Sequence, residues 1–67
     1  RQTGQLEDAV WFFQQAISIE EEIYGYESEL LIQPYRLLLL TLLKLERKEE
    51  ALEVYSRLQL IPNQENL

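Results

Sequence analysis

The stretch from residue 30 to residue 45 constrains the fold more than any other part of this chain. It is dominated by Leu and Ile, and residues 37–40 are four consecutive leucines. Successive side chains of an α-helix point about 100° apart, so these four leucines point around its whole circumference. A helix that is apolar all round is buried on more than one side. We therefore predict a helix over residues 29–45 that lies between two others.

This leucine-rich segment is too short and too interrupted to cross a membrane, which takes about 20 apolar residues. Gln33, Pro34 and Arg36 interrupt it. Pro34 lacks an amide donor and is best tolerated in the first turn of a helix. The regular helix therefore starts near Gln33, or it starts earlier with a kink one turn in and Ser28 as its cap. We favour the start near Ser28 with local distortion.

Apolar residues on both sides of this segment recur at spacings of three and four, which is typical of amphipathic helices. They predict helices over residues 5–24 and 47–61. Gly25 is suited to end the first helix, and Pro62 and Asn63 to end the last. The members of the two series are Leu6, Ala9, Val10, Phe13, Ala16, Ile17 and Ile23, and then Ala51, Leu52, Val54, Tyr55, Leu58 and Ile61.

A run of five charged residues, 46–50, separates the second predicted helix from the third. Lys44, Arg47 and Lys48 suit the carboxyl end of one helix, and Glu49 and Glu50 suit the first turn of the next. We therefore predict a surface turn. Because neither Gly nor Pro marks it, a continuous helix over residues 35–60 remains the alternative.

The composition argues against an enzyme. The chain of 67 residues has no Cys and no His, which excludes disulfides, zinc sites of the usual kind, thiolate chemistry and imidazole catalysis. Its hydroxyl groups have no base to activate them, and the glutamates at 20–22 point about 100° apart, so we expect a solvated face there and not a cation site. We expect no catalytic residue, cofactor or metal. The lack of Cys suits a reducing compartment, and we expect the cytoplasm.

The formal charge of −6, from 12 acidic and 6 basic residues, argues against a nucleic-acid partner. The basic cluster of Lys44, Arg47 and Lys48 is interleaved with glutamates. The chain starts at Arg1 with no targeting signal, and we expect it to be a piece excised from a longer protein.

An internal repeat relates the first and third predicted helices at an offset of 42 residues. A period between 20 and 50 residues predicts a solenoid of stacked helical units. The matched pairs are Ala9 with Ala51, Val10 with Leu52, Phe13 with Tyr55, and Ala16 with Leu58.

These residues resemble the second helix of the tetratricopeptide (TPR) repeat, which has a small residue, an aromatic four positions on and a small residue three further. Ala9, Phe13 and Ala16 match that pattern, and Gly4 matches the family's turn glycine. The 42-residue period is similar to the long variety in kinesin light chains. In that variety a glycine follows the long helix, and Gly25 lies 16 residues after Ala9 and 26 before Ala51.

The resemblance implies an all-α fold, a three-helix antiparallel fragment of an α-solenoid that makes one unit of residues 1–67. Residues 1–26 would be the second helix of one repeat, with 1–3 the tail of a missing first helix, and 27–67 one complete repeat. The chain departs from the family where Glu29 stands for the expected proline, Glu46 for the turn glycine and Leu58 for the second small residue. Arg36 and Leu37 replace asparagines that grip a peptide, so we do not expect that clamp.

The expected function is non-catalytic binding of a partner protein or peptide, by a scaffold in which two sets of residues have different tasks. Ala9, Phe13, Ala16, Ala51, Leu52 and Tyr55 would hold the helices together. The predicted partner contacts are Trp11, Phe12, Gln33, Arg36, Leu40 and Lys44. Trp11 or Phe12 would either anchor a partner or cover a neighbouring helix of the same solenoid.

The alternative function is purely structural: an oligomerisation or capping element that self-associates through the leucine-rich helix. Soluble monomers rarely expose apolar patches beyond a few hundred square ångströms. Two flanking helices cannot cover Leu37, Leu39, Leu40 and Leu43 together, so the isolated chain is expected to form a symmetric homodimer.

Overall fold

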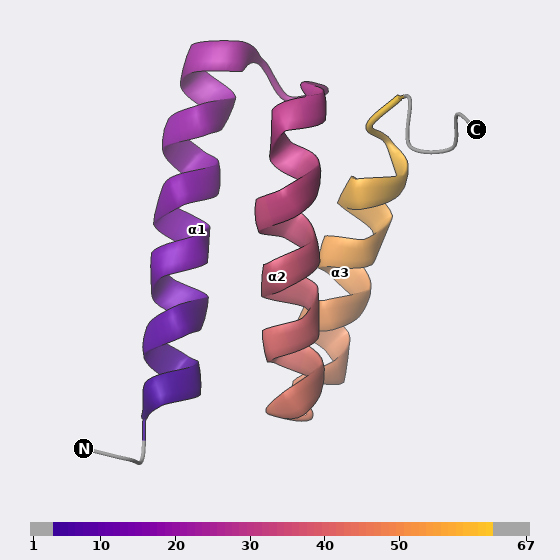
Figure 1. The fold of residues 1–67 in the computed structure, drawn as a ribbon. Coiled ribbons are helices and arrows are strands. Elements are labelled where there is room, and N and C mark those ends of the chain that lie inside the picture. Colours follow the sequence, from indigo (N-terminus) through magenta and orange to yellow (C-terminus); the bar gives the residue numbers. More distant parts are fainter. Residues whose placement is uncertain (1–3, 63–67) are drawn as a thin grey trace.

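The computed structural model describes residues 4–62, and that part of the chain is all-helical, with no strand. Its elements are α1 (Gln5–Tyr24), the short 3₁₀ helix η1 (Glu29–Leu31), α2 (Ile32–Lys44) and α3 (Lys48–Gln59). The three α-helices alternate in direction and stand in a row with α2 in the middle (Figure 1). The predicted all-α class with three antiparallel helices is thus confirmed. Our predictions for residues 1–3 and Asn63 lie outside the described residues.

The middle helix holds the structure together. It packs against α1 and against α3, whereas α1 and α3 make no backbone contact with each other. Leu31 and Leu42 are the most enclosed side chains, with 0% and 1% of their surface exposed. The predicted position of the leucine-rich helix between the other two is confirmed. The buried apolar residues are Val10, Ile17, Leu31, Tyr35, Leu38, Leu42, Ala51, Val54, Leu58 and Ile61.

The chain enters α2 through a distorted first turn, as the position of Pro34 predicts. The Ser28 hydroxyl accepts a hydrogen bond of 3.1 Å from the backbone N–H of Leu30. Residues 29–31 then form the 3₁₀ turn, and the regular α-helix begins at Ile32. Pro34 therefore lies in the first turn of α2, where an amide has no partner within the helix.

A sharp break separates α2 from α3, and the alternative of one continuous helix is wrong. The N–H of Arg47 donates to the carbonyl of Leu42 (2.9 Å), and the N–H of Glu46 donates to that of Leu43 (3.0 Å). These two bonds make a Schellman motif, in which the residue after the helix adopts a left-handed conformation. Glu46 does so, with φ 61°. The motif ends α2 without the glycine that usually takes this position.

Two left-handed positions lie 42 residues apart, the offset of the sequence repeat. Gly4, just before α1, has φ 95°, and Glu46, just before α3, has φ 61°. Gly4 and Glu46, which are equivalent in the sequence repeat, thus both have positive φ. The backbone conformation is therefore similar at these two positions, although one residue is glycine and the other is glutamate.

Replacing Glu46 by glycine should raise the free energy of unfolding by about 0.5–1 kcal/mol. Glycine adopts positive φ without the steric cost that a Cβ incurs, and this gain exceeds its larger entropy loss on folding. The change also removes a negative charge from the carboxyl end of α2, where the helix dipole disfavours it. Urea unfolding followed by circular dichroism measures the difference. The matched change Glu49→Gly, inside α3, should lower stability instead.

For two of the residues expected to hold the helices together, the prediction is wrong because their side chains are exposed. Leu52 is 66% exposed and Tyr55 is 48% exposed. Ala51 is buried as expected, and Ala9, Phe13 and Ala16 are half-buried.

No helix in the described part of the chain is long and apolar enough to cross a membrane.

Candidate functional site

An open apolar groove runs between α2 and α3. It consists of two adjoining hollows of about 500 and 570 Å³ that share Leu39 and Tyr55. No residue of α1 borders it. We call it the α2–α3 groove; it is lined by Arg36, Leu39, Leu40, Leu43, Lys48, Ala51, Leu52, Tyr55, Leu58 and Gln59.

The charge of this groove is opposite to the charge of the chain. The only charged residues that line it are Arg36 and Lys48, and no carboxylate does. The whole sequence, by contrast, has twice as many acidic as basic residues. The groove is therefore a leucine-lined hollow with two cations at its border.

The structure does not bring the predicted partner contacts together on one surface. Arg36 and Leu40 lie together in the α2–α3 groove. Gln33 and Lys44 are exposed on α2 but do not line the groove.

Trp11 and Phe12 lie on α1, away from that groove, and are both more than half exposed. Their rings meet edge to face, with centroids 5.3 Å apart and planes at 74°. Edge-to-face packing of this kind is a favourable arrangement for two aromatic rings.

Sequence reasoning missed Leu52 and Tyr55 as part of an open surface. The repeat register matched them to Val10 and Phe13 and so suggested burial. The excess of leucine on α2 does indicate this surface. It predicts that the two flanking helices leave part of the leucine side chains, Leu39 and Leu43 among them, uncovered.

A second apolar surface lies on α1. Phe12, Ile19 and Ile23 are 63%, 59% and 64% exposed, and their spacing places them within about 40° of one another around the helix. We call these three residues the outer stripe. The buried residues Val10 and Ile17 lie about 160° and 140° from its centre. Helix α1 thus has one apolar face packed on α2 and a second one open.

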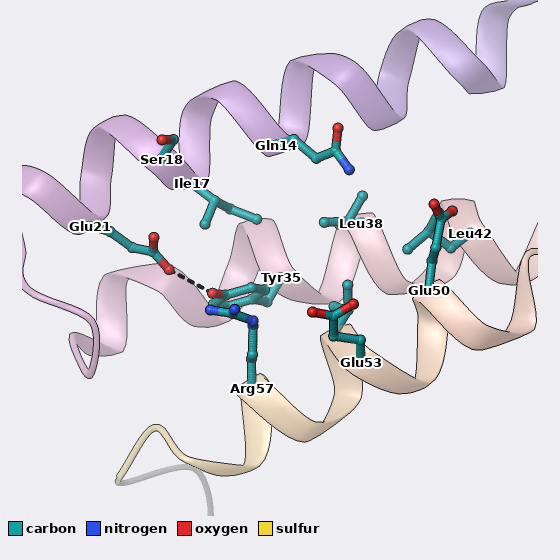
Figure 2. Close-up of a pocket in the computed structure, with 11 residues that line it drawn as sticks. Gln14, Ile17, Ser18, Glu21, Tyr35, Leu38, Leu42, Glu50, Glu53 and Arg57 are labelled. Carbon is teal, nitrogen blue, oxygen red and sulfur yellow. Dashed lines mark hydrogen bonds between the residues drawn. The ribbon is translucent and has the colours of Figure 1, made fainter.

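The opposite side of the α2–α3 pair carries a cleft of about 260 Å³ with both polar and apolar lining residues, bordered by all three helices (Figure 2). Its apolar floor includes Ile17, Leu38 and Val54. At one end the Tyr35 hydroxyl donates a 2.7 Å hydrogen bond to Glu21. This bond ties α1 to α2, so Glu21 is not simply part of a solvated face.

The environment of Tyr35 raises its pKa from 10.0 to about 12. Burial of the ring is the main cause, and the hydrogen bond to Glu21 and that residue's negative charge add to it. The guanidinium of Arg57, which points toward the hydroxyl in Figure 2, acts in the opposite direction.

Stability should consequently fall as pH rises from about 10 to about 12. The unfolded chain loses the tyrosine proton near pH 10, while the folded chain keeps it to about pH 12, so this contribution is complete below pH 10 and lost above 12. Urea unfolding at a series of pH values measures it. Tyr35→Phe should reduce stability by about 1 kcal/mol at neutral pH and flatten the alkaline decline. An equally steep decline in the Phe variant would contradict the assignment.

Among residues 4–62 there is no group of three or more carboxylates placed to hold a metal ion, and the sequence has no His or Cys. The α2–α3 groove can bury apolar surface of a binding partner and pair charges at its border.

Comparisons with models of protein families, with curated proteins and with solved structures gave no match to this chain.

Proposed function

We propose that this chain is a non-catalytic protein-binding unit of the tetratricopeptide type, whose open apolar faces are covered by helices of a partner or of further repeats. Apolar surfaces of this kind on two sides of a small protein are typical of interaction sites.

The observation that carries this proposal is a difference between equivalent positions of α1 and α3. Positions that are buried on α3 are open or half-buried on α1, and positions that are buried on α1 are open on α3. On α3 the buried residues are Ala51, Val54 and Leu58. Their equivalents 42 residues earlier are Ala9, Phe12 and Ala16, of which Phe12 is 63% exposed and the two alanines are half-buried.

The positions that are buried on α1 are, in turn, open on α3. Val10 and Ile17 of α1 are buried against α2. Their equivalents on α3 are Leu52, which is 66% exposed, and Gln59, and both line the α2–α3 groove. Each amphipathic helix thus has one face for a helix that precedes it and one for a helix that follows. A single unit fills only one of the two on each helix, which is how stacked repeats bury their surface.

A selection of binding peptides tests this proposal. A display library of helical peptides is selected on the wild-type protein, and the binders are then measured on Leu52→Glu. We expect binders with apolar residues at spacings of three and four, and at least about a tenfold loss of affinity on the variant, because a charge then lies in the groove.

The matched control is Leu60→Glu, since Leu60 is 71% exposed and does not line the groove. It should leave the affinity unchanged. A library that yields no binder, or binders that hold equally well to Leu52→Glu, would refute the proposal.

Self-association is the second candidate function. It is favoured by the exposure of Leu40 and Leu43, at 56% and 50%, which leaves the α2 side of the α2–α3 groove open. In solution a second copy is always available to cover it.

A further inference from the structure

The two open surfaces differ in charge as well as in place. Helix α1, which carries the outer stripe, has acidic residues and no basic one. The α2–α3 groove is bordered by Arg36 and Lys48 and has no carboxylate. The acidic residues of α1 are Glu7, Asp8, Glu20, Glu21 and Glu22.

We propose that two copies of this chain associate head to tail, with the outer stripe of α1 of one molecule seated in the α2–α3 groove of the next. This inference rests on the proposed function, since it takes the groove to be a protein-binding surface, and it names the occupant.

The spacing of the apolar residues in the outer stripe is suited to binding in a groove. Phe12, Ile19 and Ile23 follow one another at seven and four residues along one side of α1. This is the pattern of apolar anchors with which an amphipathic helix enters an apolar groove. The two surfaces lie on different helices of the row, so one molecule can use both at once.

Charge favours this partner over a symmetric one. Asp8 and Glu22 are exposed and lie on the same side of the outer stripe, about 40° and 80° from its centre, so this side of the stripe can approach the border of the groove where Arg36 and Lys48 lie. Complementary charges fix the register of an interface and exclude wrong partners. Two grooves face to face would instead set Arg36 and Lys48 of one copy against the same cations of the other.

A contact between two different surfaces leaves one of each free at the ends of every assembly. Such heterologous contacts build rings when the rotation closes and open chains when it does not. The wild-type protein should therefore grow beyond a dimer as its concentration rises, and added salt should reduce this growth by screening the charges at the border.

Two complementary variants test the inference by sedimentation equilibrium or light scattering. Leu52→Glu damages the groove and keeps the stripe, while Ile19→Lys damages the stripe and keeps the groove. Each variant alone should remain a monomer. Mixed in equal amounts, they should form a 1:1 dimer that grows no further, because one intact stripe meets one intact groove.

Controls of matched exposure are Leu60→Glu and Tyr26→Lys, at 71% and 72% exposed, which lie outside both surfaces and should assemble like the wild type. Circular dichroism checks that each variant keeps its helices. Should Leu52→Glu or Ile19→Lys lose them, Leu40→Glu or Ile23→Lys changes the same surface.

Three results would overturn the inference: a wild-type protein that stays monomeric at all concentrations, a mixture that stays monomeric, or Ile19→Lys that still dimerises on its own. The last result would mean that groove meets groove. If the copies do not associate but selected peptides still bind the groove and are lost in Leu52→Glu, this inference fails and the proposed function stands. If both experiments fail, the groove is not a binding surface.

Discussion

Replacing Leu42 by alanine should cost roughly 2–5 kcal/mol, the largest effect of any single change considered for this chain. Leu42 is 1% exposed and lies in the middle helix, where its side chain is part of the core that both neighbouring helices share. The loss combines the transfer free energy of the missing carbons with the cavity that they leave. A chain of about this length buries only about 60% of the surface of its unfolded state, so its stability is marginal and most molecules should unfold.

The measurement is urea unfolding followed by circular dichroism, at protein concentrations low enough to keep the molecules separate. Leu40→Ala is the matched control, because it makes the same change two residues away on the open side of α2. It should shift the free energy of unfolding by less than about 1 kcal/mol. Equal effects of the two changes would show that Leu42 and Leu40 do not differ in burial, which would contradict this orientation of α2.

Replacing Ile17 by alanine should be the second most damaging change, at roughly 2–4 kcal/mol. Ile17 is 6% exposed and belongs to the face of α1 that packs against α2. Because the backbone of α1 contacts α2 and η1 but not α3, the change should weaken the docking of α1 in particular. Hydrogen exchange should show that the amides of α1 lose protection before those of α3.

Ile19→Ala is the control for this prediction, since Ile19 has the same side chain on the same helix but is 59% exposed. We expect it to change stability by less than about 1 kcal/mol. If Ile19→Ala proved to be the more damaging change, the assignment of the two faces of α1 would be wrong.

Much of the fold could be predicted because local signals and burial agree. The apolar spacing and Gly25 give α1 the bounds that the structure has, residues 5–24. Ser28 and Pro34 indicate the distorted entry into α2. The break at Glu46 was predicted only from charges at helix ends, and its left-handed conformation had no glycine to announce it.

The details of packing were less predictable. The repeat register treats Val10 and Leu52 as equivalent, yet Val10 is buried and Leu52 is open, because α1 meets α2 from one side of the row and α3 meets it from the other. The hydrogen bond between Tyr35 and Glu21 was missed for a similar reason. It joins two helices, and its formation depends on how each is rotated about its axis, which apolar spacing does not fix.

The row of three helices also bears on how quickly the chain folds. The backbones of α1 and α3 do not contact each other, so no close approach of the first and last helices has to form before the rest can pack. Proteins built from such local contacts reach the native state within microseconds to milliseconds, because closing a short loop costs little entropy. A stopped-flow or temperature-jump experiment should therefore find refolding in this fast range, with the α2–α3 hairpin, joined by the shortest connection, as a suitable nucleus.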